Sequence, residues 1–141
     1  MRQQPLKPRL QDWPERLAAL VEARREAPFA WGSNDCGLFM ADAVMAVTGE
    51  DPAAALRGYS TEEGAEAVLG EDGLEGTVAR ALSAIGCGDC PPALAQRGDV
   101  ALALLGNQPT MTVVLGEVLA GPGPRGLIFL PLARILRAWS V

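Results

Sequence analysis

The 141-residue sequence contains no histidine. Within one chain, this absence excludes the ordinary serine–histidine and cysteine–histidine catalytic pairs, histidine-ligated zinc and a histidine-based pH switch. Basic residues are also in the minority, with 12 Lys and Arg against 17 Asp and Glu and a net charge of −5. That balance has the wrong sign for a protein that follows phosphate backbones, so no nucleic-acid partner is expected.

Long hydrophobic runs are missing as well. The most apolar stretches, 38–47 and 100–105, are interrupted by Asp42 or end at Gly106, far short of the ~20 residues that span a bilayer, so no membrane insertion is expected. No cationic start leads into an apolar segment, and the three cysteines are an odd number, which is typical of a reducing cytosol. A composition of 49% hydrophobic and 21% charged residues suits one globular domain.

Helix signals fill the first half of the chain after a short N-terminal segment. Residues 1–11 contain two prolines and no apolar period, so we expect an extended arm there and a single domain over 12–141. Asp12 stands as an N-cap before Trp13-Pro14 and predicts a helix that ends before Pro28. Further helices are expected over 36–48, from the Ser60-Thr61-Glu62-Glu63 capping box through 69, and around 78–85.

From Asp99 onward, short apolar runs are separated by glycine and proline, a pattern typical of strands. The expected strands are 100–105, 111–115, 118–119, 127–130 and 135–141. Helices followed by an antiparallel meander predict an α+β fold, with one sheet face packed on the buried helix that begins at Cys36.

Cys36 is the most informative candidate for chemistry, because it lies in the first turn of a buried helix. There the free N–H groups and the helix dipole favour the thiolate, which is the reactive form of cysteine. A base must still accept the thiol proton. Asp35 or Asp99 could serve if buried strongly enough, or a partner chain could donate a histidine. Both carboxylates also have structural interpretations, Asp35 as a helix N-cap and Asp99 as a turn residue.

Two other patterns have simpler explanations. Cys87-Gly88-Asp89-Cys90 has the spacing of a zinc knuckle or a redox pair, but zinc needs four ligands and Pro91-Pro92 follows where a redox motif would start a helix. We therefore expect a loop with two incidental thiols, and neither a metal nor a cofactor. The eight acidic residues from Glu50 to Glu75 indicate a solvated acidic face, with an acidic binding patch as the alternative. The three tryptophans favour core or hinge packing over a stacking surface.

The segment Asp35-Cys36-Gly37-Leu38-Phe39 resembles the Asp-Cys-Ser-Gly-Phe-like nucleophile motif of NlpC-type papain-like cysteine peptidases. Those enzymes continue with a Gly-Asp step into the first strand, similar to 97–102, and with a His-Val-Gly-Ile-Tyr-Leu-Gly-like strand, similar to 110–116. The resemblance covers roughly Trp13 to the end of the chain and implies a papain-like core. It makes Cys36 the nucleophile position and Thr110 the histidine position, and threonine is no base near neutral pH.

A closer resemblance is to an uncharacterised branch of that superfamily found among tail genes of phages, prophages and gene transfer agents, through stretches within 29–39, 48–59 and 126–141. It implies a tail tip or hub protein with a degenerate, inactive peptidase fold, made in the bacterial cytoplasm and assembled with other tail or baseplate-like proteins into a phage-like particle.

Two alternatives to this inactive tail protein stay open. One is an active cysteine peptidase or amidase that cleaves peptidoglycan stem peptides during DNA delivery. The other is a module that holds wall peptides without cutting them, which needs Trp31 and Thr110 exposed beside Cys36.

Overall fold

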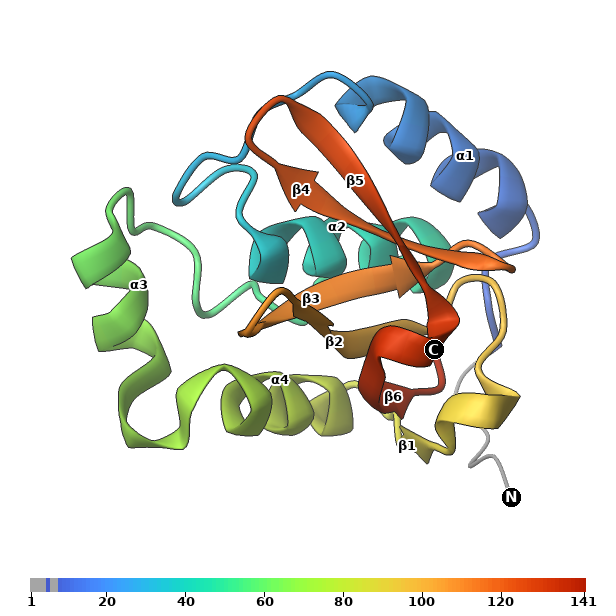
Figure 1. The fold of residues 1–141 in the computed structure, drawn as a ribbon. Helices are drawn as coiled ribbons and strands as arrows, with labels where there is room; N and C mark the ends of the chain where they lie inside the picture. The colour runs from blue at the N-terminus through green and yellow to red at the C-terminus, as the bar shows by residue number, and fades with distance from the viewer. Residues whose placement is uncertain (1–4, 6–7) are drawn as a thin grey trace.

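The computed structural model describes residue 5 and residues 8–141. These residues form four α-helices and a six-stranded antiparallel sheet, which confirms the predicted α+β class (Figure 1). Most of the arm expected over 1–11 lies outside the described residues. Its last part lies against the domain, because the Arg9 guanidinium donates to the Arg97 carbonyl at 2.8 Å and the Leu10 N–H donates to the Val47 carbonyl at 2.8 Å.

All four expected helices are present. They are α1 (Trp13–Arg24), α2 (Cys36–Thr48), α3 (Glu62–Leu69) and α4 (Gly73–Ala84), with a 3-10 turn, η1 (Gly70–Asp72), between the last two. Their ends follow local signals, because the Thr61 side chain caps α3 and Gly49 closes α2 with a φ of +84°. The predicted Asp12 cap is wrong, because its φ of −101° and ψ of 25° turn the carboxylate to Arg16 Nε at 2.9 Å instead.

The sheet contains β1 (Asp89–Cys90), β2 (Val100–Leu105), β3 (Gln108–Val114), β4 (Val118–Gly123), β5 (Gly126–Pro131) and β6 (Ile135–Trp139), in the order β1-β6-β2-β3-β4-β5. The expected meander is confirmed for β2 to β5. The last strand departs from it, because β6 crosses back to pair with β2, with Val100 opposite Trp139. This register puts Trp139, 1% exposed, into the core instead of at the sheet edge.

The expectation of a loop at the two neighbouring cysteines is wrong. Asp89 and Cys90 form β1, which pairs with β6, and both Cys87 and Cys90 are buried. The thiols pack in different apolar clusters, Cys87 in the larger core and Cys90 in a second cluster with Ala101, so they act as small apolar side chains.

The larger core lies between the sheet and helices α1 and α2. Phe39 and Val44 of α2 pack with Met111 and Val113 of β3, while α1 packs on the outside of α2. Helix α4 also contributes to this core through Val78 and Leu82, whereas α3 lies farther out, near the start of α2 (Figure 1). None of the helices in the described part of the chain is long and apolar enough to cross a membrane.

Candidate functional site

The site is built around the start of α2, where Asp35 fixes the preceding loop. Its buried carboxylate accepts three hydrogen bonds, from the N–H of Leu38 at 2.9 Å, the N–H of Gly32 at 3.0 Å and the hydroxyl of Tyr59 at 2.6 Å. The first bond is the N-cap that the sequence predicts. Together they join the loop, the helix and the segment after it, and they hold the half-buried Cys36 at the first helical position.

Tyr59 is a site residue whose role the sequence analysis missed. Burial raises the pKa of Tyr59, and its hydrogen bond to the nearby Asp35 carboxylate raises the pKa further. The phenol is therefore a fixed proton donor at neutral pH. Its place within the Leu56-Arg57-Gly58-Tyr59 stretch was visible in the sequence, but its partner lies 24 residues away and no local pattern signals the pairing.

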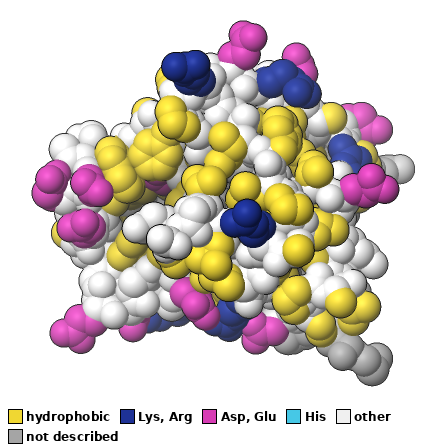
Figure 2. Space-filling view, in the orientation of Figure 1, with side chains coloured by type: hydrophobic (Ala, Val, Ile, Leu, Met, Phe, Trp, Pro, Cys, Tyr) yellow, Lys and Arg dark blue, Asp and Glu magenta, His cyan; other side chains and the backbone are white. Residues whose placement is uncertain are grey.

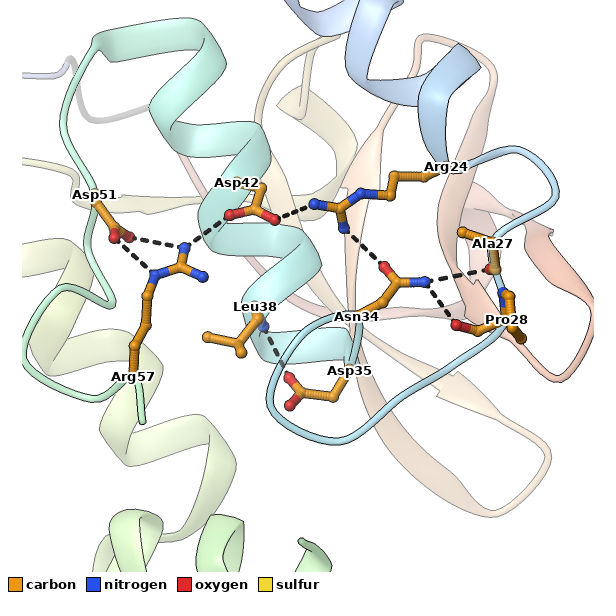
Figure 3. A network of polar contacts seen from close by, with 9 residues as sticks. All are labelled: Arg24, Ala27, Pro28, Asn34, Asp35, Leu38, Asp42, Asp51 and Arg57. Carbon is orange, nitrogen blue, oxygen red and sulfur yellow. Dashed lines mark hydrogen bonds and ion pairs between the residues drawn. The ribbon is translucent and has the colours of Figure 1, made fainter. Parts of the chain in front are cut away.

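A network of charges supports the same loop from its other side (Figure 3). Asp42, on α2, accepts from Arg24 at 2.5 Å and from Arg57 at 2.7 Å. Arg24 also donates to the side-chain oxygen of Asn34 at 2.8 Å, and the Asn34 amide donates to the carbonyls of the turn at 27 and 28. Arg57 continues the network to Asp51, and this hydrogen bond lowers the pKa of Asp51. The loop before Cys36 is thus fastened to α1, α2 and the 51–57 segment.

A pocket of about 80 Å³ opens beside Cys36. Its walls come from the start of α2, the 52–59 segment, α3 and α4, and apolar side chains make up most of them. Trp31 and Val68, which are 40% and 37% exposed, also line it. Trp31 is held edge-on by Phe29, with ring centroids 4.8 Å apart. It departs from the core packing expected of the tryptophans, whereas Trp139 is buried in the core.

Thr110 and Asp99 do not join this pocket. Thr110, on β3 opposite Ala103, is partly exposed and is not among the described residues that line the pocket. A module that holds wall peptides needs Trp31 and Thr110 exposed beside Cys36. Trp31 is exposed and lines the pocket, whereas the structure gives no contact between Thr110 and the pocket.

Asp99 lies near the far end of α2. Its buried carboxylate accepts from the N–H of Gln96 at 2.8 Å and the N–H of Val141 at 3.0 Å, and it pairs with Arg9 at 3.1 Å. Leu10, the residue after Arg9, donates its N–H to the carbonyl of Val47 near the end of α2. Val47 lies eleven residues after Cys36 on this helix, which is about 16 Å at the α-helical rise per residue. The structure thus brings Asp35 and Cys36 together and leaves Asp99 in a structural contact.

The arrangement sets what chemistry the site can perform. It offers a half-buried thiol at a helix N-terminus, a carboxylate committed to three donors, a protonated phenol and an apolar pocket, with no histidine in the chain. Within residue 5 and residues 8–141, no group of three Cys, Asp or Glu side chains is placed to hold a metal ion.

These features define an α+β domain whose central helix opens with a cysteine beside an apolar pocket. A family model described as "Domain of unknown function (DUF6950)" matches residues 8–141, and the chain belongs to this family. No curated protein and no solved structure matches the chain. The description of the family assigns no activity.

Proposed function

We propose that this protein is a structural or assembly component of a phage-like tail, at its tip or hub, built on an inactive papain-like domain of the NlpC type. One observation carries the proposal. Cys36 stands at the start of a buried helix, where the resemblance puts the nucleophile, yet the chain has no histidine. The same resemblance aligns the histidine position with Thr110, which is no base near neutral pH.

The contacts of the remaining carboxylates support inactivity. Both carboxylate oxygens of Asp35 accept hydrogen bonds, from Leu38, Gly32 and Tyr59. Asp99 pairs with Arg9 near the other end of α2. Both carboxylates are therefore engaged by other donors. Loss of one member of a cooperating catalytic pair typically removes most of the rate.

Exposed apolar side chains on the sheet support a role in protein contacts. Phe129 on β5 and Leu136 on β6 are 45% and 50% exposed. Figure 2 shows hydrophobic side chains spread over the face that β4 and β5 present, interrupted by few charges. Such surfaces suit burial against neighbouring subunits, here other tail or baseplate-like proteins in the assembled particle.

The test is genetic, in the bacterium that makes the particle. Deletion of the gene should abolish complete tails, and both the wild-type gene and Cys36→Ala should restore particles that deliver DNA. Phe129→Asp should fail to restore them, whereas Arg125→Ser, an exposed change in the same hairpin, should succeed. Complete, working particles without the protein would contradict the proposal.

A second function, a cysteine peptidase or amidase acting on peptidoglycan stem peptides, is favoured by the helix dipole at Cys36 and the adjoining pocket. Purified peptidoglycan incubated with the protein, and with the whole particle in case a partner supplies the base, distinguishes the two. Soluble fragments released by wild type and lost in Cys36→Ala would establish the enzyme. So would Cys36→Ala particles that assemble normally but fail to deliver DNA.

A further inference from the structure

The pocket beside Cys36 has walls suited to an apolar group. Three of its polar side chains are already engaged, because Asp35 accepts three hydrogen bonds, one of them from the Tyr59 hydroxyl, and the Thr77 hydroxyl donates to the Leu69 carbonyl at 3.2 Å. The other lining residues include Leu56, Val68 and Val78. A polar ligand group entering the pocket would lose its water in exchange for few new partners, whereas an aliphatic group would lose only unfavourable hydration.

The volume of the pocket limits the size of that group. At about 80 Å³, it has about half the volume of the engineered apolar cavity that binds benzene. Three or four carbon atoms fit such a space, which corresponds to the side chain of valine or leucine. The exposed lining residues Trp31 and Val68 provide apolar surface on which the rest of the ligand can lie.

The charge around the pocket determines which residues can stand on either side of the bound side chain. Helix α3 contributes Ala65, Val68 and Leu69 to the wall and carries three exposed acids, Glu62, Glu63 and Glu66. At 100° per residue, Glu62 and Glu66 border the pocket-facing stripe of α3. Figure 2 shows acidic side chains gathered over α3 with no Lys or Arg among them. The rim therefore attracts a positively charged chain.

We propose that this pocket binds the side chain of a leucine or valine in a positively charged peptide segment of a partner protein. The proposal rests on the proposed function in taking a protein as the partner. Its test uses the purified domain without particles, so the two proposals can fail separately.

Cys36 lines the pocket and reports on its occupancy. The rate of alkylation of Cys36 by iodoacetamide, followed by peptide mass spectrometry, is measured with three blocked peptides, Lys-Lys-Leu-Lys-Lys, Lys-Lys-Ser-Lys-Lys and Glu-Glu-Leu-Glu-Glu. The first should protect Cys36 at a concentration about tenfold lower than either of the others. A few carbon atoms in an apolar pocket discriminate leucine from serine by that factor or more, and the acidic rim disfavours the glutamate peptide. Equal protection by the leucine and serine peptides would overturn the proposal, and equal protection by the acidic peptide would overturn the charge assignment.

Variants locate the effect. Ala65→Leu fills the pocket from α3 and should abolish the difference between the leucine and serine peptides. Ala67→Leu, on the exposed side of the same helix, should preserve it. Val68→Ser is a milder change at the rim that should reduce the difference if Ala65→Leu does not fold. The ratio of the two peptides within each variant cancels any change in the reactivity of the thiol itself, and an unchanged ratio in both pocket variants would refute the site.

Discussion

We expect Asp42 to stabilise the loop before Cys36 through its two arginine partners, and Asp42→Asn tests this. Its side chain is 14% exposed and accepts from Arg24 and Arg57, which are 24% and 32% exposed. A hydrogen bond to a charged group contributes about 1.5–3 kcal/mol. Because both arginines reach solvent, we discount each contact to about 1 kcal/mol. The substitution should therefore lower the free energy of unfolding by about 2 kcal/mol, or about 6 °C in Tm for a chain of this size.

The assay is urea denaturation followed by tryptophan fluorescence, with Asp12→Asn as the matched control. Asp12 also pairs with an arginine on a helix, but its side chain is 59% exposed and its partner Arg16 is 54% exposed. This control should cost less than about 0.5 kcal/mol. If Asp42→Asn and Asp12→Asn shift the midpoint equally, the charge network does not stabilise the loop and the reasoning fails.

Three further predictions follow from the contacts around the site. Tyr59 is the single tyrosine, and because its pKa is raised above the ordinary 10.0, it contributes stability below pH 10 that is lost as the pH rises further. Phenolate absorbance should appear only well above pH 10 or with unfolding, and earlier in Asp35→Asn; a transition centred on pH 10 in the folded protein contradicts this. Burial raises the pKa of Cys87 to about 11, so at pH 8 Ellman's reagent should titrate one thiol, Cys36, in the native chain and all three cysteines only in denaturant. Three fast thiols in the native state would be inconsistent with the packing. Gly32 has a φ of +83°, and an added Cβ would meet the Tyr59 carbonyl oxygen. Gly32→Ala should therefore lower the free energy of unfolding by about 2–3 kcal/mol, measured by urea denaturation. An unchanged midpoint would refute the crowding.

The start of α2 could be predicted from the sequence because its signals are local. Asp35 lies immediately before the apolar helix and three residues before the N–H that it caps, so the side-chain type and its position suffice. The same holds for strands β2 to β5, whose turns contain glycine or proline. The return of β6 to β2 could not be predicted this way, because it depends on burying Trp139 against elements formed much earlier in the chain.

The remaining parts of the site depend on long-range contacts. Asp42 was visible only as a break in an apolar helix, since its partners lie 18 and 15 residues away. Tyr59 gave no sign of its bond to Asp35, and the pocket exists only once α3 and α4 are placed against the 52–59 segment. A sequence pattern can mark such residues as unusual, but the charge or hydroxyl that satisfies them is chosen by the tertiary fold.

Asp35 and Cys36 of the motif that resembles a catalytic site, and Gly32 just before it, have folding roles here, and this bears directly on function. Asp35 caps α2 and ties two segments to it, Gly32 supplies a backbone conformation that other residues disfavour, and Cys36 is a small side chain packed at the edge of the core. None of these roles requires a base. A chain without histidine can therefore need this motif for stability and for the shape of the pocket, so the motif alone is no argument for hydrolysis. The feature that retains a use without catalysis is the apolar pocket, which favours a binding role for the site.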